Sequence, residues 1–545
     1  MSNQSQSLAE SRPVNDPARA TIVNDTAVVP AALLNAIAFI GGVSSVGIEL
    51  SASRLIAPYF GDSTFIWANL IGLTLAFLSL GYWLGGRLAD RYPSAALLCV
   101  ITAVAAVAAG LVPLMSRPIL SASLQAFDNV AVGAFYGSLV GVLLMIAIPI
   151  TLLGFVSPFV IRLRLLGVTT AGRTAGDVYA ISTVGSIIGS FVPVVVLIPW
   201  LGTRLTFLVL ALILLIPSVA GLLLLGRRRR AFLAGLLVPL LVVVVTATAN
   251  ARIRPPEWGN LIYETESPYN YIQVVEDDGV RMLALNEGHA IHSVYAPDSL
   301  LTGGPWDYFM LGPLFNPLPV SGTKPVVDSA LLIGLAGGTA ARELSAAYPS
   351  IEVVGVELDP KIVEVGKEYF ELEQPNIEVV TADGRYYLKT TDRTFDLIGV
   401  DAYRQPYIPF HLTTREFFQE ISDHLTDDGV VVINVGRTAT DYRLVDAIAR
   451  TMNAVYPDVY AIDVEGYRNT ILVATKQPSA VDQFRRSTSA FAHESIVRSA
   501  AQRAIASGDI RRIDPDGEVF TDDHAPVERV IDQIILDAAL EGEEE

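Results

Sequence analysis

The fold of the second half of this chain is decided by the stretch Ala330-Leu331-Leu332-Ile333-Gly334-Leu335-Ala336-Gly337-Gly338-Thr339. It reads as an apolar strand that runs into a glycine-rich turn, and a helix-like run follows from Ala340 to Ala347. Glycines in such a turn let the backbone approach a ligand closely. The stretch therefore predicts the first strand, turn and helix of a nucleotide-binding α/β sheet.

Acidic residues follow the next three predicted strands. The strand Val353–Val356 ends in Glu357, another ends in Asp383-Gly384, and the strand Phe395–Val400 ends in Asp401. Ligands of open α/β sheets bind at the carboxyl ends of the strands, and an acid on the second strand suits ribose hydroxyls. We expect these carboxylates to converge on one pocket. The alternative, in which they only cap helices or turns, stays open.

The composition places the first half of the chain in a membrane. The chain has 545 residues, of which 51% are hydrophobic, and the apolar excess lies in the first 250. Its net charge of -18 argues against nucleic acid as a partner. With a single cysteine, Cys99, and no metal-ligand spacing among the six histidines, we predict neither a disulfide nor a metal site.

Long apolar runs fill residues 29–250, after a polar segment, 1–28, that we interpret as a disordered tail. Each run is long enough to cross a hydrocarbon core of about 30 Å as a helix. We predict a multi-pass α-helical membrane domain, with the lipid bilayer as its partner, and about seven spans. The spans lie near 30–51, 65–86, 95–115, 130–156, 178–199, 205–226 and 231–249.

Arginines between the spans give conflicting evidence on sidedness. The positive-inside rule places the arginine clusters and the amino terminus in the cytoplasm. Seven spans would then leave the rest of the chain outside, whereas a nucleotide-like cofactor favours the cytoplasm. We expect a multi-pass protein of the cell membrane with a cytoplasmic soluble domain. The clusters are Arg87 and Arg91; Arg162, Arg164 and Arg173; and Arg227 to Arg230.

Two units follow the membrane domain. Residues 251–325 predict a small β subdomain, in which Asp277-Asp278-Gly279 is a hairpin turn between two short strands. From residue 326 to residue 545 strands and helices alternate, which predicts a mostly parallel sheet with helices on both faces. The fold class is thus a helical membrane domain followed by an α/β Rossmann-like domain, of the methyltransferase type, with a small β subdomain.

Residues 258–480 resemble the spermidine synthases, which are polyamine aminopropyltransferases, and the whole chain resembles membrane-bound proteins that fuse this domain to transmembrane helices. The resemblance is carried by Ser267-Pro268-Tyr269-Asn270, Leu285-Asn286-Glu287-Gly288, Tyr308, the turn at Gly334, Val356-Glu357-Leu358-Asp359, Ala382-Asp383-Gly384, Phe395 to Asp401, and Phe520 to Glu528.

The resemblance implies a co-substrate and a set of roles. The co-substrate is decarboxylated S-adenosylmethionine, with no cofactor bound permanently. Glu357 would hold its ribose, Asp383 and Gly384 would lie near its adenine, and the turn from Gly334 to Gly338 would line its methionine-derived part. Asp401 would accept a proton from the attacking amine, assisted by Tyr308. This agrees with the chemistry, because an amine must be neutral to attack a sulfonium carbon.

The chain departs from the family at positions that concern the acceptor. The family has an aspartate where this chain has Gly337, another where it has Arg404, and a glutamine where it has Asn270. The lost acids would hold the ammonium groups of a diamine, and Arg404 would repel them. Asn270, Tyr403 and Arg404 are therefore expected to bind a different acceptor, one that is uncharged or anionic.

Three functions remain open. The first is a membrane-anchored aminopropyltransferase that acts on an amine, nominally a polyamine. The second is an S-adenosylmethionine-dependent methyltransferase acting on a membrane substrate. The third is a transporter or sensor that only binds a polyamine or a nucleoside. The chain is compatible with a homodimer.

Overall fold

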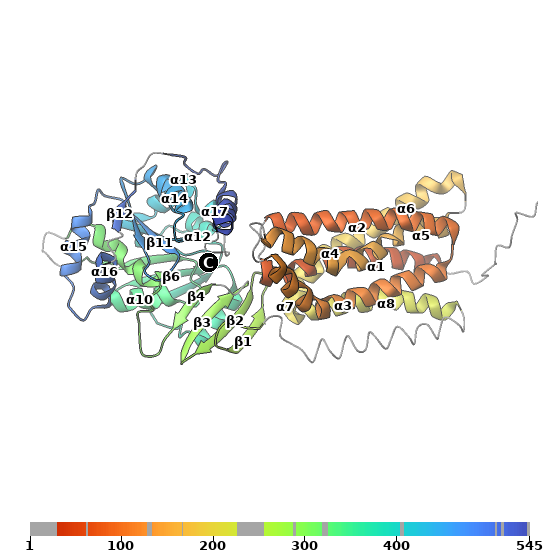
Figure 1. The fold of residues 1–545 in the computed structure, drawn as a ribbon, viewed down its shortest axis with the longest axis horizontal. Coiled ribbons are helices and arrows are strands. Elements are labelled where there is room, and N and C mark those ends of the chain that lie inside the picture. The colour runs from red at the N-terminus through yellow and green to blue at the C-terminus, as the bar shows by residue number, and fades with distance from the viewer. Residues whose placement is uncertain are drawn as a thin grey trace, which may run out of the picture.

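In the computed structural model the apolar helical part and the α/β part form two bodies side by side (Figure 1). The structure describes residues 30–60, 64–127, 133–165, 167–225, 255–286, 290–318, 325–403, 408–506, 510–513 and 517–541. The predicted tail, 1–28, and the predicted seventh span, 231–249, lie outside these residues, as does Arg404.

Six helices within the described residues are long and apolar enough to cross a membrane. They correspond to the first six predicted spans. These apolar helices are α1 (Ala31–Phe60), α2 (Thr64–Arg91), α3 (Ala95–Phe127), α4 (Gly133–Gly154) with α5 (Val156–Arg164), α6 (Ala171–Val192), and α8 (Thr203–Leu224). A 3-10 turn η1 (Val168–Thr170) precedes α6, and a π-helical turn η2 (Pro193–Leu197) and the short α7 (Ile198–Leu201) extend it.

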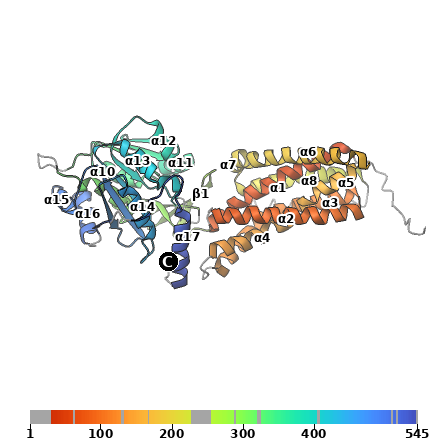
Figure 2. The same ribbon diagram turned by 90° about the horizontal axis from the view of Figure 1, so that it is seen from above.

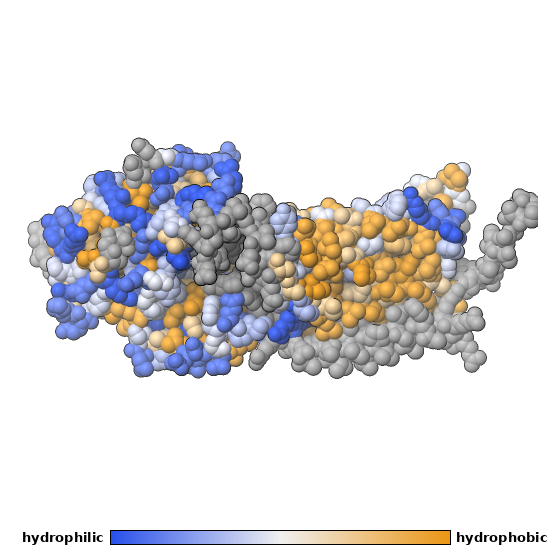
Figure 3. All heavy atoms as spheres, in the orientation of Figure 1, coloured by the Kyte–Doolittle hydropathy of each residue, from blue (hydrophilic) through white to orange (hydrophobic). Residues whose placement is uncertain are grey.

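The contacts of the helix ends distinguish two ends of the bundle. One apolar cluster joins the starts of α1 and α3 to the ends of α2 and α8 and to α5, and we call this the far end of the bundle. The opposite, near end faces the α/β part: the end of α1 and the start of α8 hydrogen-bond the segment Glu266–Tyr269. Figure 3 shows an apolar band on the bundle between hydrophilic surfaces at its two ends.

The predicted β subdomain is a four-stranded antiparallel sheet in the order β1-β2-β3-β4. It contains β1 (Asn260–Glu266), β2 (Tyr271–Asp277), β3 (Val280–Leu285) and β4 (Ile291–Tyr295). The predicted hairpin is confirmed, with Asp277 paired to Val280 and positive φ angles of 46° at Asp278 and 80° at Gly279. In both ribbon views β1 lies between the bundle and the larger sheet (Figures 1 and 2).

The larger sheet has eight strands in the order β12-β10-β11-β9-β8-β5-β6-β7. The strands β7, β6, β5, β8 and β9 pair in parallel, and β9, β11, β10 and β12 pair antiparallel. The sheet is therefore mixed, but six of its eight strands run in the same direction and only β11 and β12 oppose them, so the predicted mostly parallel sheet is confirmed. Chain order reverses between β5 and β8, which is where open α/β sheets bind ligands. The strands are β5 (Ser329–Ile333), β6 (Glu352–Glu357), β7 (Ile377–Thr381), β8 (Phe395–Val400), β9 (Leu425–Gly436), β10 (Asp458–Asp463), β11 (Asn469–Thr475) and β12 (Ile510–Arg512).

Helices cover both faces of this sheet, and each face has its own apolar core. One core includes the 3-10 segment η3 (Pro305–Phe315), α10 (Thr339–Ala347), α15 (Val481–Ser489) and α16 (Ile496–Ala506). The other includes α12 (Gly384–Thr390), the 3-10 turn η4 (Phe410–Leu412), α13 (Arg415–Asp423), α14 (Arg443–Asn453) and α17 (Val527–Glu541). The helix α11 (Pro360–Tyr369) packs against the β subdomain.

Candidate active site

The glycine-rich turn after β5 touches the end of β8. Gly334 has a φ of 87°, and a Cβ at this position would lie 2.5 Å from the backbone oxygen of Asp401. The backbone N–H of Asp401 donates to the carbonyl of Ile333 at 2.8 Å, and that of Gly334 donates to Val356 at 3.0 Å. Only glycine fits such a position. The structure therefore brings the turn, the end of β6 and Asp401 together, as the sequence predicts.

Glu357 lies buried between the turn and α11. One of its carboxylate oxygens accepts the backbone N–H of Ala336 at 2.9 Å, and the other accepts that of Asp359 at 3.0 Å. Burial raises the pKa of Glu357, and these hydrogen bonds oppose that rise. The structure thus places this carboxylate at the end of the second strand of the α/β sheet, and its role in binding a ribose stays a prediction.

Asp383 caps the helix α12 in the structure. Its side chain accepts the backbone N–H of Tyr386 at 2.9 Å and so caps α12, while His411 Nε2 lies 3.7 Å from the same carboxylate. A Cβ at Gly384 would lie 2.3 Å from a side-chain carbon of Ile333, so the small residue is required by packing against β5. Capping, which the sequence left open as the alternative role, accounts for the observed contacts of Asp383.

Asp401 is a carboxylate at this edge of the sheet, and its pKa is strongly raised. Asn434 on β9 donates its side-chain amide to Asp401 at 2.9 Å, and the Trp306 side chain donates to it as well. Burial raises the pKa of Asp401 to about 6, and the two hydrogen bonds act against that rise. A carboxyl group that titrates near neutrality is matched to taking a proton at physiological pH.

Neither Trp306 nor Asn434 is among the predicted site residues. Asn434 is in turn held by Asn469, whose amide donates to it at 2.9 Å, and its backbone carbonyl accepts the Tyr403 hydroxyl at 3.0 Å. The sequence contains a signal for it, since Asn434 is the lone polar residue in the apolar strand Val430–Val435. Trp306 has no comparable signal, because only the tertiary fold brings η3 beside Asp401.

Comparisons with known proteins identify the family of the α/β part. Residues 320–481 match the family described as Spermine/spermidine synthase domain. The C-terminal part of the chain carries a spermine/spermidine synthase domain. The family resemblance stated from the sequence is therefore confirmed for this part.

Several proteins that are similar to this domain are named polyamine aminopropyltransferases. A protein of Bifidobacterium longum named "Probable polyamine aminopropyl transferase" is 33% identical over 301 residues, which are 51% of this chain and 65% of that protein. The polyamine aminopropyltransferase of Vibrio vulnificus is 29% identical, over 40% of this chain and 74% of that protein. A crystal structure of a probable spermidine synthase from Corynebacterium glutamicum matches at 20% identity and a TM-score of 0.37, over 46% of this chain and 90% of that chain.

The structure gives a steric reason for one departure of this synthase domain from the family pattern. Gly337 donates its backbone N–H to the hydroxyl of Ser293 on β4 at 2.8 Å. A Cβ at Gly337 would lie 2.9 Å from Ser293 and 3.1 Å from Phe370. The β subdomain thus packs directly on the glycine-rich turn, and an aspartate side chain at this position would have no space.

Two predicted residues of the synthase domain have contacts away from Asp401. The buried Tyr308 accepts a hydrogen bond from the backbone of Glu465 and lies near Arg503 and Asp307. Asn270 donates to Asp359 at 2.9 Å and accepts from Asn286 at 2.9 Å. No contact of the described residues places the Tyr308 hydroxyl beside Asp401, so its assisting role stays a prediction.

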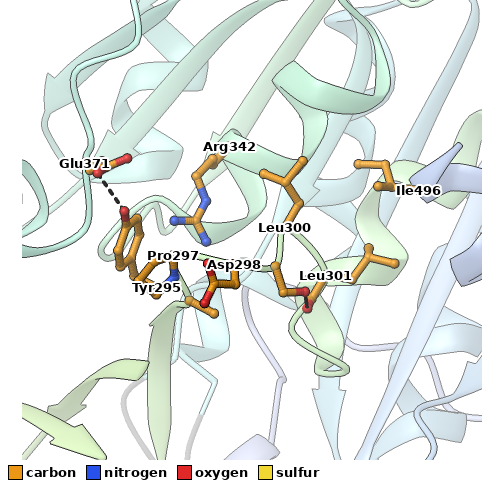
Figure 4. Close-up of a pocket in the computed structure, with 10 residues that line it drawn as sticks. Tyr295, Pro297, Asp298, Leu300, Leu301, Arg342, Glu371 and Ile496 are labelled. Carbon is orange, nitrogen blue, oxygen red and sulfur yellow. Dashed lines mark hydrogen bonds between the residues drawn. The ribbon is translucent and has the colours of Figure 1, made fainter. Parts of the chain in front are cut away.

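A cavity of about 430 Å³ lies elsewhere on the synthase domain (Figure 4). Its lining includes Tyr295, whose hydroxyl donates to Glu371 at 2.6 Å, and the guanidinium of Arg342. None of the predicted site residues lines it. Within the described residues no group of three or more His, Cys, Asp or Glu side chains could hold a metal ion.

Proposed function

We propose that the synthase domain transfers an aminopropyl group from decarboxylated S-adenosylmethionine to an amine, and that the helical bundle anchors it in the cell membrane. The observation that carries this proposal is Asp401 at the switch point of the sheet, held by Asn434 and Trp306 and touching the glycine-rich turn. The donor is a nucleoside, and Glu357 is oriented for its ribose.

The transfer needs little from the protein beyond orientation and a proton acceptor. The nitrogen of a neutral amine forms a bond to the propyl carbon next to the sulfonium, the carbon–sulfur bond breaks, and methylthioadenosine leaves with that electron pair. The proton released from the nitrogen passes to the Asp401 carboxylate. Because burial raises the pKa of Asp401 to about 6, the carboxylate is a better base than a solvated aspartate would be.

In this proposal the acceptor is an amine, and a polyamine is only the acceptor that the family name implies. Gly337 stands where an acid would hold an ammonium group, and Ser293 and Phe370 occupy the space that its side chain would need. Asn270, placed by the sequence in the acceptor site, is engaged with Asp359. These contacts support an acceptor that carries less positive charge than a free diamine.

Binding of three nucleosides tests the reaction. The purified full-length protein in detergent micelles is titrated with decarboxylated S-adenosylmethionine, S-adenosylmethionine and methylthioadenosine. Aminopropyl transfer predicts a preference for the decarboxylated form. A preference for intact S-adenosylmethionine would favour methyl transfer instead. Binding of none of the three would exclude both reactions and favour a sensor.

We also propose that the synthase domain lies on the side of the membrane opposite the arginine-rich loops. Five described arginines lie at the far end of the bundle, within or beside elements that share the far-end cluster, whereas the synthase domain is attached at the near end. Three arginines lie toward the near end, and Arg227 to Arg230 follow the far end of α8 in sequence. The far-end residues are Arg87, Arg91, Arg162, Arg164 and Arg173; the near-end residues are Arg54, Arg117 and Arg204.

This arrangement favours a domain outside the cytoplasm, because the positive-inside rule places the far end in the cytoplasm. This proposed outer location replaces the cytoplasmic location of the soluble domain, which the sequence predicts because a nucleotide-like cofactor favours the cytoplasm. The nucleoside donor would then have to be present on the outer side, so sidedness also decides where the donor is supplied.

Cysteine labelling measures the sidedness directly. Cys99 is the sole cysteine and is buried, so a Cys99→Ala background is free of thiols. Ser489→Cys places an exposed thiol on α15 of the synthase domain, and Thr169→Cys places one at the far end. In right-side-out membrane vesicles, a membrane-impermeant maleimide should label Ser489→Cys and leave Thr169→Cys unlabelled. The reverse pattern would return the domain to the cytoplasm.

A further inference from the structure

The segment between β1 and β2 is held by the membrane bundle. The guanidinium of Arg54, near the end of α1, donates to the backbone carbonyl of Ser267 and lies 3.5 Å from that of Tyr269. Arginine forms strong, directional hydrogen bonds of this kind because its donors are rigid and always charged. The end of α1 therefore fixes the backbone of this segment.

The same segment also caps a second membrane helix. Glu266 accepts the backbone N–H of Thr203, the first residue of α8, at 2.9 Å, and its hydroxyl at 2.6 Å. A carboxylate is stabilised at a helix amino terminus because the N–H groups there lack partners within the helix. Two membrane helices that are far apart in sequence thus hold one segment of the β subdomain, Glu266–Asn270.

On its other side this segment holds the end of β6. The hydroxyl of Ser267 and the amide of Asn270 both donate to the same carboxylate oxygen of Asp359. Asp359 is fully buried, and its other oxygen accepts the backbone N–H of Lys361 and caps α11. Its own backbone N–H donates to Glu357 at 3.0 Å. A continuous set of hydrogen bonds therefore connects α1 and α8 to Glu357.

We propose that the near end of the membrane bundle positions Glu357 for the nucleoside co-substrate, through the segment Glu266–Asn270 and Asp359. Arg54 and Glu266 are then positioning residues, since they act on Glu357 through other groups. This inference rests on the proposed function, in which Glu357 binds the ribose. It makes the bundle more than an anchor, because a shift of α1 or α8 would change the affinity for the donor.

Arg54→Met tests the proposal in the full-length protein. The substitution keeps an apolar stem of similar length and removes the donated hydrogen bonds, whereas Arg54→Lys keeps a charged donor. We expect Arg54→Met to weaken the binding of methylthioadenosine, and to raise the KM for the donor, by about 3- to 30-fold, the usual range for coupling through such contacts. Turnover at saturating donor and the KM for the acceptor should stay unchanged, and Arg54→Lys should restore part of the affinity.

A matched control and a second background separate positioning from loss of structure. Asp482→Asn removes one partner of an exposed ion pair on α15, 3.8 Å from Arg485, and should leave nucleoside affinity unchanged. In the Ser267→Ala, Asn270→Ala background, where the segment no longer holds Asp359, Arg54→Met should have little further effect. Additive losses in that background would overturn the route proposed here.

The outcomes distinguish this inference from the function on which it rests. If the wild-type protein binds no nucleoside, the proposed function fails and the positioning role falls with it. If the wild type binds and Arg54→Met binds equally well, the positioning role alone is wrong. A loss of turnover with unchanged donor affinity would also contradict it. Reactivity of the buried Cys99 with a thiol reagent reports whether each variant is folded.

Discussion

At the scale of single residues, the proposed aminopropyl transfer depends on the surroundings of Asp401. Burial raises its pKa, while the donated hydrogen bonds of Asn434 and Trp306 hold the rise to about 6. An aspartate with its usual pKa of about 3.9 would be a weaker base, and one buried without donors would have a higher pKa and be ionised less at neutral pH. The two donors thus keep a buried carboxyl group usable as a base.

Replacement of this carboxylate should separate binding from chemistry. Asp401→Asn keeps the shape and removes the proton acceptor, so we expect turnover to fall by about 100-fold or more while methylthioadenosine still binds. Turnover that persists in this variant would show that another group takes the proton. Steady-state kinetics and calorimetry on the full-length protein give the two quantities.

The pH dependence has a definite sign. Asp401 must be ionised to accept a proton, so kcat/KM should rise with pH through about 6 as this group loses its own proton. Asn434→Leu removes a hydrogen bond that favours the ionised form, which should raise the pKa of Asp401 and move the acidic limb of the profile to higher pH. An unchanged acidic limb in Asn434→Leu would assign it to a different group.

At the scale of elements, the turn after β5 and the contact of α1 with α6 both depend on glycine. Gly334 combines a positive φ with close contact to the backbone of Asp401. In the bundle, α6 packs on α1 through Gly185 and Gly189, where an added Cβ would lie 2.1 Å and 2.3 Å from backbone oxygens of α1. The two helices approach this closely because the side chains are absent.

Gly334→Ala should destabilise the α/β fold more than the same change in a matched turn. Gly279 has a similar φ of 80° but no atom within 4 Å of the position of an added Cβ. We expect Gly279→Ala to cost about 1 kcal/mol for the backbone conformation alone, and Gly334→Ala to cost about 3 kcal/mol or more, because the clash adds to it. Denaturant unfolding followed by tryptophan fluorescence compares the two.

Gly185→Ala should loosen the membrane bundle. The added methyl group would meet the backbone oxygen of Phe39 and force α6 away from α1. Gly86→Ala, on α2, meets no atom within 4 Å and serves as the control. Because Cys99 is buried in the far-end cluster, its rate of reaction with a thiol reagent during heating in detergent reports the loss of packing. Equal rates for the two variants would contradict this account.

At the scale of the whole molecule, parts distant in sequence are joined by charged and polar side chains. Arg385 on α12 donates to Glu420 on α13 and to Asp522, each at 2.8 Å, and Asp522 also accepts the hydroxyl of Thr414. The Arg385 guanidinium lowers the pKa of Asp522 to about 2. The carboxyl-terminal segment, which the family resemblance singled out, is thereby fixed to the helices behind the site.

Arg385→Met should therefore destabilise the whole α/β domain. Arg385 is 8% exposed, but its two carboxylate partners are partly exposed, so we expect the loss of their shared cation and its hydrogen bonds to cost about 1 to 3 kcal/mol. Arg415→Met removes an arginine that is 53% exposed and paired with Glu416, and should change the free energy of unfolding by less than about 1 kcal/mol. Denaturant unfolding of both variants measures the difference.

The Asp522 contribution should also disappear in acid. Since the folded-state pKa of Asp522 is lowered to about 2, the ionised group stabilises the fold above its unfolded value of about 3.9. That stabilisation should be lost as the pH falls from about 4 towards 2. The loss should be absent in Asp522→Asn and retained in Asp523→Asn, which changes the exposed neighbouring residue.

The sequence by itself determined the membrane helices, the β subdomain, the glycine turn and the order of the acids, because each depends on local patterns: long apolar runs, alternation, positive φ and strand ends. Only the tertiary structure decided that Asp383 caps a helix, that Trp306 and Asn434 hold Asp401, that β4 fills the space beside Gly337, and that Arg54 and Glu266 connect the bundle to Glu357. These contacts join segments tens to hundreds of residues apart, and the spacing of residues along a chain carries no information about which distant side chains will meet.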